Sequence, residues 1–204
     1  MILAVILIPV IAGILVLLIP FKKRSHMEIF LESMVILNSI LVWTLLVHRP
    51  ENIFTLANFT GNLSISFDVD GMGMVFGGLV SALWPLATLY AFEYMTKEEH
   101  EKVFFMFYTM TYSVTLGISF SANLLTMYFF YELLTLVTVP LVMHTLTREA
   151  ILASRKYLYY SLGGAAFAFI GLIFIIIYGN TTDFVLGGVL DPEKIGARTN
   201  VLLL

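Results

Sequence analysis

Long apolar segments alternate with short polar connections along this chain of 204 residues. About 20 residues of helix, rising 1.5 Å each, cross a hydrocarbon layer of roughly 30 Å. Because a bilayer offers no water to backbone amides, such segments must be helical. The pattern predicts an all-α integral membrane protein, a single membrane domain with six transmembrane helices at about 2–20, 28–47, 72–94, 103–120, 122–144 and 154–178.

The connection between the second and third helices follows a different period. In "HRPENIFTLANFTGNLSISFDVDG", residues 48–71, two short stretches alternate around "TGN". Alternation with a period of two on either side of a glycine-containing turn is typical of paired strands. We expect a short external β-hairpin there.

Composition strengthens the membrane assignment and narrows the function. Hydrophobic residues make up 59% of the chain and charged residues only 12%. A net charge of −3, spread along the chain, does not suggest a nucleic-acid partner. The absence of cysteine excludes disulfides, iron–sulfur ligation and thiol catalysis. Any redox centre would belong to another subunit, and the lipid bilayer is the first partner.

Charge in the connections predicts the orientation of the helices. Eight of the 11 Lys and Arg residues lie in or beside the connections after the first, third and fifth helices. Because Lys and Arg are retained on the cytoplasmic side, these connections should face the cytoplasm. We therefore expect a multi-pass protein of the cell membrane with its N-terminus outside. Residues 179–200 would form an external loop, and 201–204 would start a truncated seventh helix, as in a fragment or a split subunit.

One carboxylate, Glu132, stands inside the fifth apolar segment, "YFFYELLTLVTVPLVMH". A charge at the bilayer centre costs roughly 2.5–3.5 kcal/mol on insertion scales and marks a functional site by default. A nearby cation that moves would switch the proton affinity of Glu132, as a proton relay requires. Tyr128 and Thr135 share its helical face and would hold the carboxyl group or water. The alternative is a protonated Glu132 that bonds a neighbouring helix during assembly.

Three further residues are candidates on the cytoplasmic side. Pro140 frees a backbone carbonyl and permits a kink. His144 closes the fifth segment with a side chain suited to proton uptake, although an interfacial histidine is often merely solvated. Lys156 follows a helix cap at Thr147 and would either reach the headgroups or turn towards a carboxylate.

No other chemistry is indicated. The spacing of His, Asp and Glu resembles no metal site, and no nucleophile triad or phosphate loop is present. We expect no catalytic residues, no metal and no cofactor, and therefore no bond chemistry in this chain.

Three segments carry a resemblance to a known family: "FDVDGMGMVFGGLVSALWPLATLYAFEYM", "GISFSANLLTMYFFYELLTLVTVPLVMH" and "ASRKYLYYSLGG". In order and spacing they resemble the antiporter-like, proton-conducting subunits of respiratory complex I, of Mrp sodium/proton antiporters and of membrane-bound hydrogenases. The resemblance implies a fold of about fourteen helices, of which this chain holds helices one to six. It also implies that Glu132 matches the helix-five Glu and Lys156 the Lys that starts helix six.

The family's helix-seven Lys, which faces that Glu, has no counterpart before residue 204. The resemblance therefore implies other membrane subunits as partners, one of them supplying this Lys. Our first hypothesis is proton translocation, with sodium exchange as a variant, inside a redox-driven ion pump or a cation/proton antiporter. The alternative is a non-conducting subunit that links neighbouring modules, and a stand-alone small transporter or receptor fragment is the third.

Overall fold

A computed structural model describes residues 1–50, 52–59, 63–191 and 194. Within them the six predicted helices and the hairpin are confirmed. In chain order the elements are α1 (Ile2–Leu18), α2 (Arg24–Val47), β1 (Phe54–Asn58), β2 (Ser64–Phe67), α3 (Gly71–Tyr94), the 3₁₀ turn η1 (Met95–Lys97), α4 (Glu101–Ser119), α5 (Leu124–Val142) and α6 (Arg148–Tyr178).

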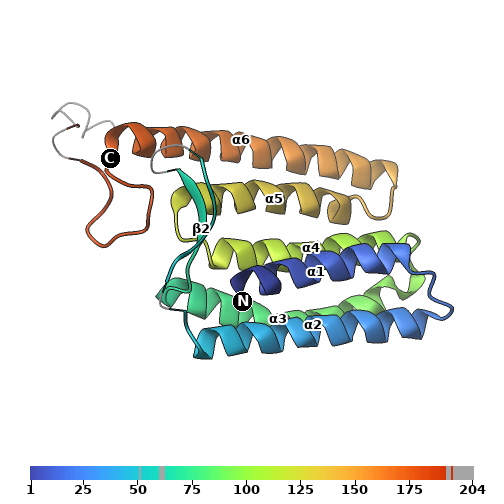
Figure 1. The fold of residues 1–204 in the computed structure, drawn as a ribbon. Helices are drawn as coiled ribbons and strands as arrows, with labels where there is room; N and C mark the ends of the chain where they lie inside the picture. The colour runs from blue at the N-terminus through green and yellow to red at the C-terminus, as the bar shows by residue number, and fades with distance from the viewer. Residues whose placement is uncertain (51, 60–62, 192–193, 195–204) are drawn as a thin grey trace.

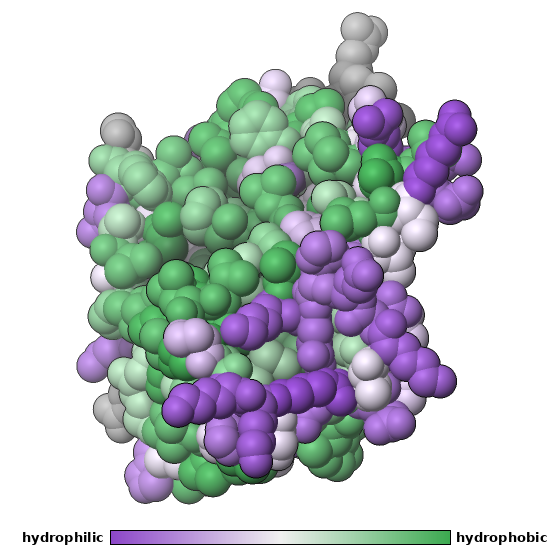
Figure 2. Space-filling model, turned by 90° about the vertical axis from the view of Figure 1, so that its right-hand side faces the viewer, coloured by the Kyte–Doolittle hydropathy of each residue, from purple (hydrophilic) through white to green (hydrophobic). Residues whose placement is uncertain are grey.

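The helices lie side by side in a bundle whose outer member is α6 (Figure 1). Next to α6 lies α5, then α4 together with α1, and then α3 together with α2. The hairpin crosses one end of the bundle, and the connections after α1, η1 and α5 lie at the other (Figure 1). Figure 2 looks onto that second end and shows hydrophilic side chains gathered over part of it, with hydrophobic side chains around them.

Close packing joins α1 to α4, although about a hundred residues separate them in the sequence. Ser113 of α4 donates a hydrogen bond to the carbonyl of Ile6, and the Nζ atom of Lys102 donates to that of Ile19 at 3.0 Å. At Gly13 the backbones approach so closely that a Cβ atom would lie 2.7 Å from the carbonyl oxygen of Met106. A glycine is required at this crossing because any side chain would separate the two helices.

Side-chain caps fix the beginnings of three helices. The carboxylate of Asp70 accepts from the Gly73 amide at 2.6 Å, Asn123 from Thr126 at 2.8 Å, and Thr147 from Ala150 at 3.2 Å. Such a bond satisfies one of the amides that have no partner in the first turn. The cap expected at Thr147 is thus confirmed, and α6 begins at Arg148, six residues before the apolar segment from which its span was predicted.

The hairpin pairs Phe54 with Phe67 and Asn58 with Ser64 in antiparallel register. Its second strand lies against the start of α5, where the side-chain amide of Asn123 donates to the Ser64 carbonyl at 2.9 Å and to the Ser66 hydroxyl at 2.7 Å. Asn123 is buried, so these bonds are shielded from water. Thr126 adds to this contact, because its hydroxyl oxygen accepts from the Ser66 amide at 2.9 Å, so two side chains of the start of α5 hold the hairpin.

Four of the helices, α2, α3 with η1, α5 and α6, are long and apolar enough to cross a membrane. The apolar α1 is shorter, with 17 residues. Most of the predicted loop 179–200 beyond 191, and the predicted start of a seventh helix at 201–204, lie outside the described residues.

Candidate functional site

Glu132 is the ninth of the 19 residues of α5 and lies about 12 Å along the helix axis from its first residue. The side chain is partly buried. Its Oε1 atom is buried and accepts no hydrogen bond from any residue that the structure describes. A buried carboxylate oxygen without a donor is costly, so the carboxyl group at this position needs a proton, water or a cation.

The two hydroxyl residues predicted beside Glu132 lie on its helical face. Tyr128 stands one turn before Glu132, where its hydroxyl interacts with the carboxyl group. The ring of Tyr128 packs against Phe169 of α6, with 5.5 Å between centroids, which orients it. Thr135 is buried one turn after Glu132. The structure thus brings Tyr128, Glu132 and Thr135 together beside the contact between α5 and α6.

The other side of Glu132 is open. Phe129 and Leu136, which precede and follow it by one turn, expose 44% and 58% of their surface. These positions neighbour Glu132 on the helix surface. The carboxyl group therefore stands at the border between the part of α5 covered by α6 and an uncovered apolar stripe, formed by Phe129 and Leu136.

Lys156 does not face Glu132. It is exposed and forms no ion pair with a described residue. The residues of α6 that turn towards α5 are its neighbours: Ser154 is buried, and the hydroxyl of Tyr157 lies 2.7 Å from that of Thr138. Of the two positions that the sequence left open for Lys156, the structure shows the one directed away from α5.

His144 follows the end of α5 and lies about 18 Å along the chain axis from Glu132, if the helical rise is continued. Its Nδ1 atom is 2.8 Å from the Leu141 carbonyl oxygen, and its ring packs edge-on against Phe104 of α4 at 5.4 Å. The Nε2 atom is buried and has no hydrogen-bond partner among the described residues. Pro140 lies inside α5, two residues before its last. Neither residue touches Glu132.

A second group of buried polar side chains was not predicted from the sequence. Glu32 and Asn38 of α2, Trp84 of α3 and Tyr108 of α4 each have a buried polar atom without a partner among the described residues. Asn38 is completely buried. The signal was present in the sequence, because Asn38 stands in the middle of the second predicted span and Glu32 inside it, and the rule applied to Glu132 holds for them too.

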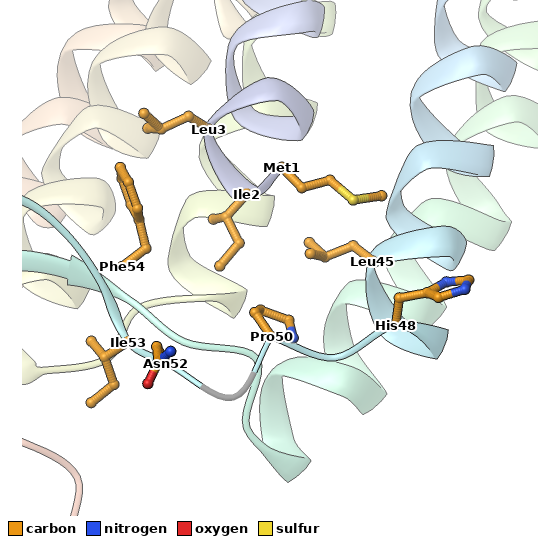
Figure 3. A pocket seen from close by; sticks show the side chains of 9 residues that line it. All are labelled: Met1, Ile2, Leu3, Leu45, His48, Pro50, Asn52, Ile53 and Phe54. Atoms are coloured by element: carbon orange, nitrogen blue, oxygen red, sulfur yellow. The ribbon is translucent and has the colours of Figure 1, made fainter.

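A cavity of about 300 Å³ lies at the hairpin end of the bundle (Figure 3). The beginning of α1, the end of α2 and the segment leading into β1 line it, mostly with apolar side chains such as Ile2, Leu45 and Phe54. His48 borders it and bonds the Thr44 carbonyl of its own helix at 3.1 Å. Among the described residues, the lining contains no carboxylate, and no three His, Asp or Glu side chains gather as metal ligands.

Comparison with known proteins gives concordant matches. The family model "NADH:quinone oxidoreductase/Mrp antiporter, TM" matches residues 121–195, which include α5 and α6. The Na(+)/H(+) antiporter subunit A1 of Staphylococcus aureus is 28% identical over 179 residues, covering 85% of this chain, and the same subunit from strain JH9 gives the same values. The chain spans 22% of the length of these relatives.

A solved structure shares the fold. It is a chain of the membrane-bound sulfane sulfur reductase, an archaeal respiratory membrane complex, with a TM-score of 0.75 and 19% sequence identity. The match covers 89% of this chain and 38% of that one. The arrangement of α1 to α6 is therefore one that a membrane-bound respiratory complex also contains.

Proposed function

We propose that this chain is an antiporter-like membrane subunit of the kind found in Mrp and complex I-type assemblies, as its matches support, and that it translocates protons with Glu132 as the relay. The observation that carries the proposal is the partly buried carboxyl group in the middle of α5, one of whose oxygens has no donor among the described residues. In general, a cation that approaches a carboxyl group lowers its proton affinity, which is the coupling that a proton relay needs.

The cation must come from beyond the described residues. Lys156 points away from α5, so it does not serve as the direct partner of Glu132. The uncovered stripe of Phe129 and Leu136 offers the place where another helix would pack, bringing a Lys to the carboxyl group. A further segment of the same polypeptide or a companion membrane subunit would supply it.

His144 and Lys156 have supporting roles in this proposal. Both belong to the end of the bundle where the Lys- and Arg-bearing connections lie, which we assign to the cytoplasmic side, with the N-terminus outside. The unpartnered Nε2 atom of His144 would accept a proton there. Tyr128 and Thr135 would orient the carboxyl group or water, and Pro140 would allow the end of α5 to bend.

Glu132→Gln tests the relay, since it keeps the shape and removes the titratable group. The variant is assembled in its complex, and proton movement is followed in sealed vesicles, normalised to the amount of assembled complex. We expect flux to fall at least tenfold while assembly is retained. Glu149→Gln, in the exposed first turn of α6, is the matched control and should leave both unchanged.

The second candidate function is a linking subunit that does not conduct. It is favoured by one observation, that no Lys or Arg among the described residues faces Glu132. In that case Glu132→Gln would reduce the yield of the complex and leave the flux per complex normal. Undiminished flux with normal assembly would contradict the relay proposal.

A further inference from the structure

A row of polar side chains runs through the contact between α2, α3 and α4. At one level Tyr108 of α4 lies near Thr88 of α3, within reach of the charge of Glu32 of α2. At the next level the hydroxyl of Tyr112 lies 3.0 Å from that of Ser39, with Asn38 beside it. The two levels are connected by Trp84, whose ring stacks on Tyr112 at 4.9 Å and packs on Tyr108 at 5.4 Å.

Several atoms in this row have no hydrogen-bond partner among the described residues although they are buried. They are the Oε2 atom of Glu32, both amide atoms of Asn38, the Nε1 atom of Trp84 and the hydroxyl of Tyr108. Buried polar groups in proteins are nearly always bonded, to protein or to internal water. Asn38, with 0% of its surface exposed, cannot turn towards the lipid or the surface.

The unpartnered atoms of this row include both hydrogen-bond donors and hydrogen-bond acceptors, which distinguishes between a metal cation and water as their ligand. The indole of Trp84 only donates, whereas the amide of Asn38 and a protonated Glu32 both donate and accept. A metal cation is bound by acceptors alone, so the indole would have no role in a cation site. Water both donates and accepts, and it satisfies every member of the row.

We infer that α2, α3 and α4 enclose a water-lined proton-binding site, with Glu32 as its titratable group and the Asn38–Tyr112 pair as its inner end. Glu32 lies about 12 Å along α2 from Arg24, and Asn38 about 21 Å. The site therefore leads from the charged end of the bundle towards its middle. Tyr108 is the titratable side chain of α4 that is close enough to be influenced by the charge of Glu32, and α3 contributes the neutral Thr88.

This site is separate from Glu132. In the bundle α4 stands between α2 and α5, so the row and the carboxyl group of α5 lie on opposite sides of α4 (Figure 1). The inference does not depend on the proposed role of Glu132, because it rests on α2, α3 and α4 alone.

Carbodiimide labelling tests the proton at Glu32, since the reagent attacks protonated carboxyl groups in apolar surroundings. The chain is labelled in its native membrane at neutral pH, and modified peptides are quantified by mass spectrometry. We expect severalfold more modification at Glu32 than at Glu28, the matched control one turn earlier, which is paired with Arg24 at 3.2 Å. Equal modification at the two residues would overturn the inference. Protection of Glu32 by added sodium would also overturn it, because it would replace the proton with a metal cation.

Radiolytic hydroxyl-radical labelling tests the water, because radicals form where water is bound. We expect oxidation of Trp84 to exceed that of Phe167 severalfold, although Phe167 of α6 exposes 78% of its surface. Loss of the Trp84 signal in Asn38→Leu, without loss of folding, is the further expected result. A Trp84 that is as unreactive as Phe167 would show a dry contact and overturn the inference.

Discussion

Replacing Asn123 by Ala should weaken the contact between the start of α5 and the hairpin. The side chain caps the helix through the Thr126 amide at 2.8 Å and donates to Ser64 and Ser66 of β2 at 2.9 and 2.7 Å. Loss of an N-cap costs about 1 kcal/mol. Leaving buried polar groups of the strand without their donor costs about 1–3 kcal/mol more. We expect Asn123→Ala to lower the free energy of unfolding by about 2–4 kcal/mol in total.

Two further variants separate these contributions. Asn123→Ser keeps an oxygen that caps Thr126 but has no donor that reaches the strand, so it should recover about 1 kcal/mol relative to Ala. Asn58→Ala, in the exposed first strand, is the matched control and should change stability by less than about 0.5 kcal/mol.

Reversible unfolding of the purified chain in mixed micelles gives the free energies, and hydrogen exchange of the first-turn amides of α5 locates the effect. Faster exchange is expected at Thr126 in the Ala variant and not in the Ser variant. If Asn123→Ala is as stable as Asn58→Ala, the contact between hairpin and α5 does not carry the energy assigned to it here.

Two other changes test how α5 is held by its neighbours. Gly117→Val would place a Cβ atom against the ring of Phe130 and should destabilise the chain by about 1–3 kcal/mol, measured by the same unfolding titration. Gly163→Ala, in open space on α6, is the control and should not destabilise the chain. Equal costs for the two variants would contradict the packing of Gly117 against Phe130. The hydroxyl contact of 2.7 Å between Thr138 and Tyr157 should give a coupling of about 0.6 kcal/mol, and at most about 1.7, in a double-mutant cycle with Thr138→Val and Tyr157→Phe. A coupling of zero would show that α5 and α6 do not depend on this bond.

The helices and the hairpin were predictable because the signals are local. Apolar length, the alternation around "TGN" and the cap at Thr147 depend on neighbours in the sequence, and all three agree with the structure. The start of α6 at Arg148 follows from the cap at Thr147, and the span predicted at 154–178 is the apolar part of the same helix.

The surroundings of the candidate site depend on how each helix is rotated, which the sequence does not specify. The sequence allows two orientations for Lys156, and the structure distinguishes them because Ser154 and Tyr157 turn towards α5. In the sequence Glu32 is one more charge near the polar start of a helix, and it becomes unusual only because its Oε2 atom is buried without a partner among the described residues.

The contact between α1 and α4 has a consequence for synthesis. The carbonyl of Ile6 finds its partner in Ser113, which the ribosome adds about a hundred residues later. At about 5–20 residues per second, α1 waits roughly 5–20 s in the membrane before α4 exists. During that interval its contact surface, with Gly13 at its centre, has to be covered by lipid, by the insertion machinery or by a chaperone. Helix α1 thus meets α2 soon after its synthesis but reaches α4, with which it packs most extensively, only after α2 and α3 have been made.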